Sequence, residues 1–131
     1  MEAGLAELTE AVAAILAAHL VAEFNDAVAV GNFDEFLQRV TDDAVVRFER
    51  VPGAGTLEFA GREAYTQAYA QRPPDDQLDV TGAVRLEESA AVVPFAWRRD
   101  GQAGTMLLTF TRGPFEELDE WLVSAMTVRF D

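Results

Sequence analysis

The amino-acid sequence predicts an α+β fold in which helices cover one face of a curved, mostly antiparallel sheet. Two observations lead to this prediction. In the N-terminal part of the chain, apolar residues recur at steps of three and four, which is the spacing of a buried helix face. From Gln77 onward, apolar and polar residues alternate, which is typical of half-buried strands. Helices first and strands afterwards define the α+β class.

A long first helix is expected near the N-terminus. Its apolar stripe follows helical spacing and comprises Leu5, Leu8, Val12, Ile15, Leu16, Leu20, Phe24 and Val28. Gly31 and Asn32 predict the end of this helix, because both residues tolerate the left-handed conformation that closes a helix. Polar residues interrupt its Ala-rich start and no Lys or Arg occurs before Arg39, so we expect neither a membrane span nor a signal peptide.

A second helix, two strands and a third helix are expected next. The second helix is marked by apolar residues at helical spacing, namely Phe33, Phe36, Leu37 and Val40. Residues 41–43 should end it before a strand over residues 44–51, in which Val46, Phe48 and Arg50 share the inward face. A turn then leads to a short strand over residues 56–59. The third helix should begin at Gly61 and end before Pro73-Pro74, since proline has no amide hydrogen.

Four further strands are expected, over residues 77–87, 90–99, 104–111 and 121–130. Pro94 lies inside the second of them, which suggests a sheet edge or a bulge. Asp100-Gly101 predicts a hairpin between the second and the third. In the last strand, the alternation places on one side Leu122, Ser124, Met126, Val128 and Phe130.

Composition excludes several kinds of site. The chain has no cysteine and one histidine, so we expect no disulfide, no thiolate nucleophile, no metal site and no cofactor. The formal charge of −13 argues against nucleic acid or an anionic membrane as a partner. All ten basic residues are Arg, which suggests the codon usage of a bacterium with a GC-rich genome. We expect one cytoplasmic domain spanning residues 1–131.

Several short motifs occur in an order known from one protein family. A Gly-Asn-Phe-Asp turn at residues 31–34 is followed by Asp-Asp-Ala-Val-Val at 42–46 and by Gly-Arg-Glu-Ala at 61–64. In these motifs the chain resembles the nuclear transport factor 2 family, in its SnoaL-like and ketosteroid-isomerase-like branch. The resemblance implies a cone, in which a strongly curved sheet wraps round the first helix (the cystatin-like or nuclear transport factor 2-like roll). It also implies a pocket at one end and a homodimer formed through the outer sheet face.

The catalytic groups of ketosteroid isomerase are not found at the matching positions. That enzyme uses a carboxylate base, a tyrosine and a protonated aspartic acid. By the resemblance, the position of the tyrosine falls on Phe24 and that of the base on Phe48. The second acid would fall within residues 106–109, which contain no carboxylate. Isomerase activity by that mechanism is therefore not expected.

Weak catalytic candidates remain, and each has a structural alternative. His19 could be a general acid or base at a pocket rim, or a solvated residue beside the helix stripe. Arg50 and Arg99 could bind a ligand carboxylate or carbonyl at the pocket mouth, or pair with one of the many acidic residues. Tyr65 and Tyr69, four residues apart, could point their hydroxyl groups into a cavity or simply pack.

Three functional hypotheses follow from these residues. The first is a protein that binds a small hydrophobic molecule in an apolar cone lined by Phe24, Phe48, Tyr65, Tyr69, Trp97 and Met106. The second is an isomerase, cyclase or hydrolase with an unusual catalytic set, such as Tyr69 with Arg50 or His19. The third is a dimeric accessory protein without a ligand, whose aromatic side chains fill the cone.

Overall fold

The computed structural model describes residues 9–112 and 121–131 of the chain. In chain order, its elements are α2 (Glu10–Val30), α3 (Asp34–Leu37), β1 (Val40–Val51), β2 (Gly55–Ala60), α4 (Arg62–Gln71), β3 (Leu78–Val80), β4 (Arg85–Glu87), β5 (Ala90–Trp97), β6 (Ala103–Arg112) and β7 (Trp121–Phe130). The seven strands form one sheet in the order β2-β1-β7-β6-β5-β3, and β4 also pairs with β5. The pairings are antiparallel except that of β1 with β7, which is parallel.

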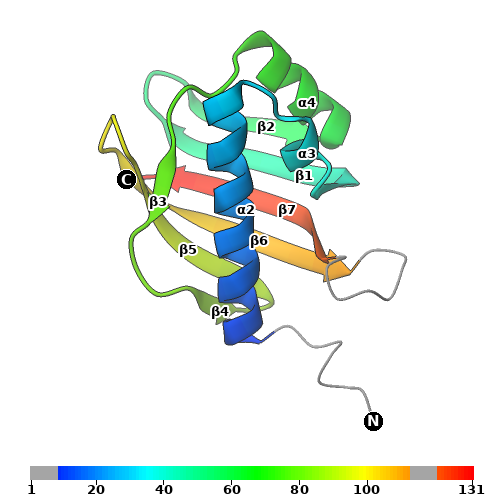
Figure 1. Cartoon of the computed structure of the whole chain (residues 1–131), viewed down its shortest axis with the longest axis vertical. Coiled ribbons are helices and arrows are strands. Elements are labelled where there is room, and N and C mark those ends of the chain that lie inside the picture. Colours follow the sequence, from blue (N-terminus) through cyan, green and yellow to red (C-terminus); the bar gives the residue numbers. More distant parts are fainter. Residues whose placement is uncertain (1–8, 113–120) are drawn as a thin grey trace.

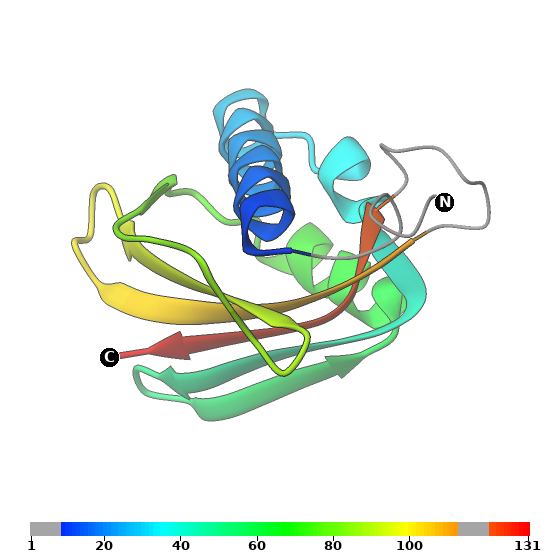
Figure 2. The ribbon, with the colours of Figure 1, turned by 90° about the horizontal axis from the view of Figure 1, so that it is seen from below.

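The sheet is strongly curved, and α2 crosses its concave face (Figure 1). Figure 2 shows α3 and α4 on the same side of the sheet as α2, with the sheet forming the other layer. The sheet is not closed into a barrel, because β2 and β3 stand at opposite ends of the strand order. This arrangement confirms the predicted α+β fold with a curved sheet wrapped round a long N-terminal helix.

Both ends of α2 are capped. Thr9 accepts a hydrogen bond from the Val12 N–H on its side-chain oxygen (3.2 Å). At the other end Gly31 has φ 77°, and its N–H donates to the Ala27 carbonyl (2.8 Å). The helix end predicted at Gly31 is therefore confirmed.

The buried face of α2 differs from the predicted stripe. It is formed by Ala13, Ala17, Leu20, Val21, Phe24 and Ala27. Leu20 and Phe24 belong to both sets, but Ile15 is 58% exposed, and Leu5 and Leu8 lie outside the described residues. Apolar residues occur on most sides of this helix, so their spacing alone did not identify the side that faces the sheet.

By length and composition, α2 is also long and apolar enough to cross a membrane, with a mean hydropathy of 1.5. The core helix of a folded domain meets the same criteria. In this structure one face of α2 contributes to the hydrophobic core. The absence of a membrane span and a cytoplasmic location stay predictions.

β1 begins earlier than predicted. α3 is a single helical turn, and Val40 already pairs with Val123 of β7. The Val123 N–H donates to the Arg39 carbonyl (2.7 Å), which holds the start of β1 in the sheet. Residues 41–43, expected to separate helix from strand, therefore lie within β1, because β1 pairs with β7 on both sides of them.

The strand predicted over residues 77–87 is divided into β3 and β4. Pro94 of β5 faces the gap between them. Its carbonyl accepts a hydrogen bond from the Thr81 N–H (2.9 Å), and its own nitrogen has no hydrogen to donate. The prediction of a sheet edge or bulge at Pro94 is wrong, since β5 pairs without a register shift with β6 on its other side. Pro94 instead interrupts the pairing on one side.

At the start of β7, the side chains do not alternate between the two faces of the sheet as predicted. Thr109 pairs with Ala125 and Phe110 with Val123, so Ser124 is an extra residue and β7 bulges there. The Ser124 hydroxyl donates to the Thr109 carbonyl (3.3 Å). Val123 is consequently buried and Leu122 and Ser124 are not, whereas Met126 and Val128 are buried on the same side, as the alternation predicted.

The predicted hairpin between β5 and β6 is confirmed. Gly101 has φ 81°, and its N–H donates to the Trp97 carbonyl (2.9 Å). The Trp97 N–H in turn donates to the Gln102 carbonyl (3.0 Å), which closes the turn. The hairpin places residues 98–100 next to the segment that precedes β3 (Figure 1).

Candidate functional site

A cavity of about 550 Å³ lies between the helices and the concave face of the sheet. Its lining is mostly apolar and aromatic. The lining residues are Leu20, Val21, Phe24, Phe36, Phe48, Tyr65, Tyr69, Pro74, Asp75, Asp76, Leu78, Phe95, Trp97, Arg99, Asp100, Met106, Met126 and Val128. All six residues predicted to line a ligand pocket are among them.

Helical spacing and strand alternation together account for this lining. Leu20 and Phe24 are four residues apart on α2 and share its buried face. Phe95 and Trp97 are two residues apart on β5, so both point to the concave side. The Phe24 and Trp97 rings, from the helix and the sheet, lie 6.0 Å apart between centroids. Such tilted aromatic contacts hold the cavity wall in place.

Two tyrosines on α4 form a hydrogen-bonded pair inside the cavity. The hydroxyl oxygens of Tyr65 and Tyr69 lie 2.5 Å apart. Burial raises the pKa of both hydroxyl groups; the hydrogen bond from Tyr65 acts in the opposite direction on the pKa of Tyr69 without cancelling the rise. Both phenols are therefore protonated at neutral pH. We call these two residues the tyrosine pair.

The tyrosine pair has one hydroxyl proton to spare. Two phenols carry two protons, and their mutual hydrogen bond uses one of them. Among the described residues, no further acceptor bonds the second proton. The pair can therefore donate one hydrogen bond to a molecule in the cavity.

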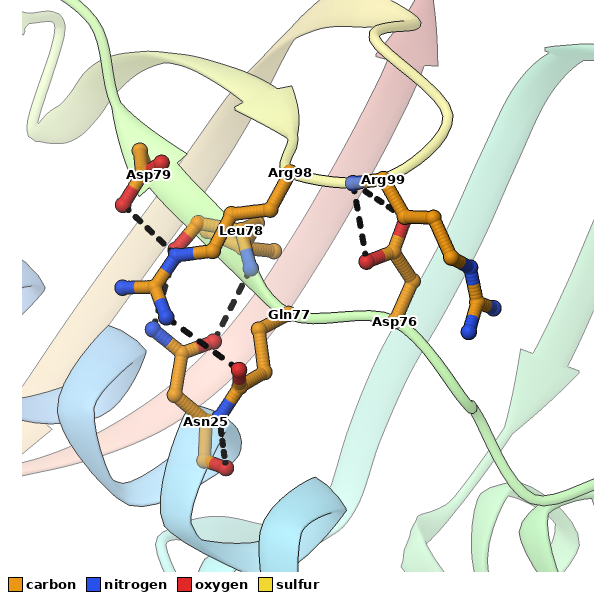
Figure 3. A network of polar contacts seen from close by, with 7 residues as sticks. All are labelled: Asn25, Asp76, Gln77, Leu78, Asp79, Arg98 and Arg99. Carbon is orange, nitrogen blue, oxygen red and sulfur yellow. Dashed lines mark hydrogen bonds and ion pairs between the residues drawn. The ribbon is translucent and has the colours of Figure 1, made fainter.

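Charged residues lie only where the cavity meets solvent. Asp75, Asp76, Arg99 and Asp100 line it there, and we call these four residues the rim. Arg99 and Asp75 form an ion pair (3.2 Å) between side chains that are 68% and 88% exposed. The carboxylate of Asp76 accepts hydrogen bonds from the backbone N–H groups of Arg99 (3.1 Å) and Asp100 (3.1 Å), as Figure 3 shows for Arg99.

The Asp76 carboxylate is stabilised in its ionised form. Desolvation acts to raise the pKa of this carboxyl, but the backbone hydrogen bonds from Asp100, Arg99 and Gln77, together with the Arg99 charge, lower the pKa below its usual value. The same bonds fasten the segment before β3 to the β5–β6 hairpin. These hydrogen bonds therefore hold the charged residues of the rim in a defined arrangement.

Asn25 of α2 connects the helix to the rim segment. Its side-chain oxygen accepts from the Leu78 N–H (2.9 Å), and its side-chain nitrogen donates to the Leu78 carbonyl (2.9 Å). The Gln77 side chain donates to the Asn25 carbonyl (2.9 Å) (Figure 3). Sequence analysis missed this residue, although an Asn beside the buried Phe24 was a signal that a partly buried polar group needed partners.

The weak catalytic candidates are not brought together. Tyr69 lines the cavity, but Arg50 and His19 do not. Arg50 has φ 60° and lies at a register shift between Phe48 and Val51, so the alternation that predicted an inward Arg50 is broken. It is exposed.

His19 is also exposed and lines a separate groove of about 350 Å³, together with Ile15, Arg39 and Trp121 among others. Neither Tyr69 with Arg50 nor Tyr69 with His19 can therefore form a catalytic set in this structure. Arg99 is at the cavity mouth as predicted, and it has the acidic partner that the structural alternative predicted.

The inner cavity lacks acid–base groups other than the tyrosine pair. Within residues 9–112 and 121–131, no Asp, Glu, His or Arg is buried. In the same residues, no group of three or more His, Asp or Glu side chains could hold a metal ion. Phe24, Phe48 and Met106 occupy the cavity wall where the resemblance would place the catalytic groups of ketosteroid isomerase.

Comparison with known proteins identifies the fold. No protein-family model and no curated protein sequence matches the chain. Among solved structures, an NTF2-like (nuclear transport factor 2-like) protein of unknown function from Cytophaga hutchinsonii is 17% identical, with 95% of this chain and 92% of that chain covered and a TM-score of 0.58. A Bacillus subtilis protein provisionally named an isomerase is 12% identical over 95% of this chain and 90% of its own (TM-score 0.58).

A third similar structure, of a protein from Catenulispora acidiphila in complex with S-DNPA, is 24% identical. It covers 88% of this chain and 90% of that chain, with a TM-score of 0.55. At these identities the likeness shows the fold alone. The chain therefore has a nuclear transport factor 2-like fold, as the resemblance in its sequence predicted.

Proposed function

We propose that the protein binds a small hydrophobic molecule in the cavity. The observation that carries this proposal is the open volume of about 550 Å³, which lies within the range of ligand pockets, about 300 to 1,000 Å³. The hypothesis of a cone filled by its own aromatic side chains requires that this space be closed. Phe24, Phe48 and Trp97 instead line it.

The tyrosine pair supports a ligand with a hydrogen-bond acceptor. The spare hydroxyl proton lies among apolar groups, where an unmade hydrogen bond costs about 1 to 3 kcal/mol. A ligand oxygen or nitrogen that accepts this proton would remove that cost. The expected ligand is therefore apolar over most of its surface with one acceptor that reaches Tyr65 or Tyr69.

Binding is favoured over the alternative of an isomerase, cyclase or hydrolase. Acid–base chemistry at neutral pH needs a group that accepts a proton, and the tyrosine pair has raised pKa values. The carboxylates that line the cavity are confined to the rim. The structure from Catenulispora acidiphila in complex with S-DNPA gives a precedent for a bound molecule in a protein of this fold.

A neutral fluorescent probe, N-phenyl-1-naphthylamine, tests the proposal. Its emission should rise on binding to the protein. Val128→Phe should weaken binding about tenfold or more, because Val128 lines the cavity and the larger side chain would occupy it. Thr127→Val, at the preceding position of β7 and outside the cavity lining, is the matched control and should leave binding unchanged. Circular dichroism melting curves must first show that both variants fold.

The proposal fails if the wild-type protein does not bind the probe, or if folded Val128→Phe binds it as well as the wild type. A homodimer through the outer sheet face remains a separate prediction. Sedimentation at micromolar concentration tests it, and a monomer would contradict it.

A further inference from the structure

The rim has an excess of negative charge. It contains three carboxylates, those of Asp75, Asp76 and Asp100, and one guanidinium, that of Arg99. Arg99 is already paired with Asp75. The carboxylate of Asp100 has no hydrogen-bond or ion-pair partner among the described residues, since only its backbone N–H is bonded, to Asp76. Two negative charges at the cavity mouth are therefore not balanced by a rim cation.

Arg98 does not balance these charges. Arg98 is next to the rim in sequence, but its guanidinium donates to the Asp79 carboxylate (2.9 Å) and to the Gln77 side-chain oxygen (3.2 Å) (Figure 3). The whole chain carries a formal charge of −13, which adds to the local field. A molecule that enters the cavity therefore passes through a region of negative potential.

We propose that the cavity is selective for amphipathic amines, whose apolar part occupies the cavity and whose ammonium group stays at the rim beside Asp76 and Asp100. This inference rests on the proposed function. An alkylammonium group resembles the lysine side chain, with a pKa of about 10.4, and is charged at neutral pH. A carboxylate of the same length would be held beside Asp76 and Asp100 and would be repelled.

Arg99 does not reverse this preference. A ligand carboxylate could reach its guanidinium only in competition with Asp75, which already lies 3.2 Å from it. The pair is highly exposed, so its own attraction is modest and screened by water. The unbalanced carboxylates of the rim would still face the incoming anion.

Three ligands with the same ten-carbon chain test the inference: decylamine, 1-decanol and decanoic acid. Each is titrated into the wild-type protein at low ionic strength, below its critical micelle concentration, in competition with N-phenyl-1-naphthylamine. Decylamine should bind most tightly, decanol next and decanoic acid about tenfold or more weaker than the amine. Raising the salt to about 0.5 M should bring the three affinities together, because exposed charges are screened at that ionic strength.

Two rim variants should shift the ratio of amine to alcohol affinity in opposite directions. Asp100→Asn should lower the ratio about threefold, and Arg99→Gln should raise it about threefold. Changes of this size are expected because each variant removes one exposed charge, whose interaction with the ammonium group is screened by water. Asp26→Asn removes the same charge from an exposed site on α2 that does not line the cavity, and should leave the ratio unchanged.

The results separate the two proposals. If decanol binds but the amine binds no better and the acid no worse, the charge selectivity is overturned while the proposed binding function stands. The selectivity is also overturned if neither rim variant changes the ratio. If none of the three molecules displaces the probe, the selectivity is overturned, and the proposed binding function is then decided by whether the probe itself binds.

Discussion

Tyr65 and Tyr69 join two groups of aromatic side chains through their hydroxyl groups. They lie one turn apart on α4, with the oxygens 2.5 Å apart. Tyr65 packs near Phe48 of β1, with ring centroids 6.4 Å apart, and Tyr69 stacks on Phe36 of α3, with ring centroids 6.3 Å apart. The hydrogen bond therefore links the part of the cavity wall formed by the sheet to the part formed by the helices.

Removing one hydroxyl group of the tyrosine pair should destabilise the protein by more than half of the loss caused by removing both. Tyr65→Phe or Tyr69→Phe leaves a buried hydroxyl without its partner, so each should lower the free energy of unfolding by about 1 to 3 kcal/mol. The double variant replaces both hydroxyl groups and should be less destabilised than the sum of the single variants. Urea unfolding of all four proteins measures this coupling. Additive losses would show that the two hydroxyl groups act independently.

Alkaline titration should reveal the raised tyrosine pKa values directly. The chain contains only two tyrosines, so phenolate absorbance near 295 nm reports on this pair alone. The unfolded chain should ionise near pH 10, the usual pKa of tyrosine, and the folded protein only at higher pH. The unfolded state then binds fewer protons than the folded state, so stability should fall as the pH rises above about 10. Phenolate absorbance that appears near pH 10 in folded protein would contradict this assignment.

Gly104→Ala should destabilise the sheet. A Cβ atom at Gly104 would clash with the Arg129 carbonyl oxygen and lie 2.9 Å from the ring of Phe95. Backbone or a buried ring must move, so we expect a loss of about 2 kcal/mol or more, measured by urea unfolding. Gly82→Ala is the control, because its Cβ meets only a Pro94 side-chain carbon at 3.2 Å. Equal losses in the two variants would contradict the prediction.

Asn25→Ala should loosen the rim segment. The change leaves the Leu78 N–H and carbonyl without their side-chain partner, at a cost of about 1 to 3 kcal/mol. The amide hydrogen of Leu78 should then exchange faster, which hydrogen exchange measured by NMR can detect. Gln67→Ala, on the exposed side of α4, should change neither the free energy of unfolding nor the exchange rate of the Leu78 amide. Unchanged exchange at Leu78 in Asn25→Ala would show that other contacts hold the segment.

The fold could be predicted from sequence because its signals are local. Gly31 ends the first helix and Asp100-Gly101 forms a hairpin through the conformations that these residues favour on their own. The errors arise where a distant strand decides the outcome. Pro94 divides a strand predicted as continuous, and Ser124 bulges β7 because of its pairing with Thr109.

The candidate site, like the fold, could be predicted where its signals are local and not where distant segments meet. Alternation and helical spacing placed Phe24, Phe48 and Trp97 in the cavity wall correctly. The phase of an alternating pattern fails beyond a register shift, and this explains why Arg50 is not in the cavity. Arg99 was predicted at the cavity mouth, but the acidic residues of the rim were not, because Asp76 and Asp100 come together only when the hairpin meets the segment before β3.

The parallel pairing of β1 with β7 has a consequence for the order of assembly. Val46 pairs with Met126, about 80 residues later in the chain, and both strands lie inside the sheet rather than at its edges. Contacts of such long sequence separation slow folding, since a large loop must close first. During synthesis on the ribosome, one edge of the β1–β2 hairpin would stay without its neighbour until β7 emerged. Until then, the backbone groups of that edge are open to pairing with another chain, which is a route to aggregation.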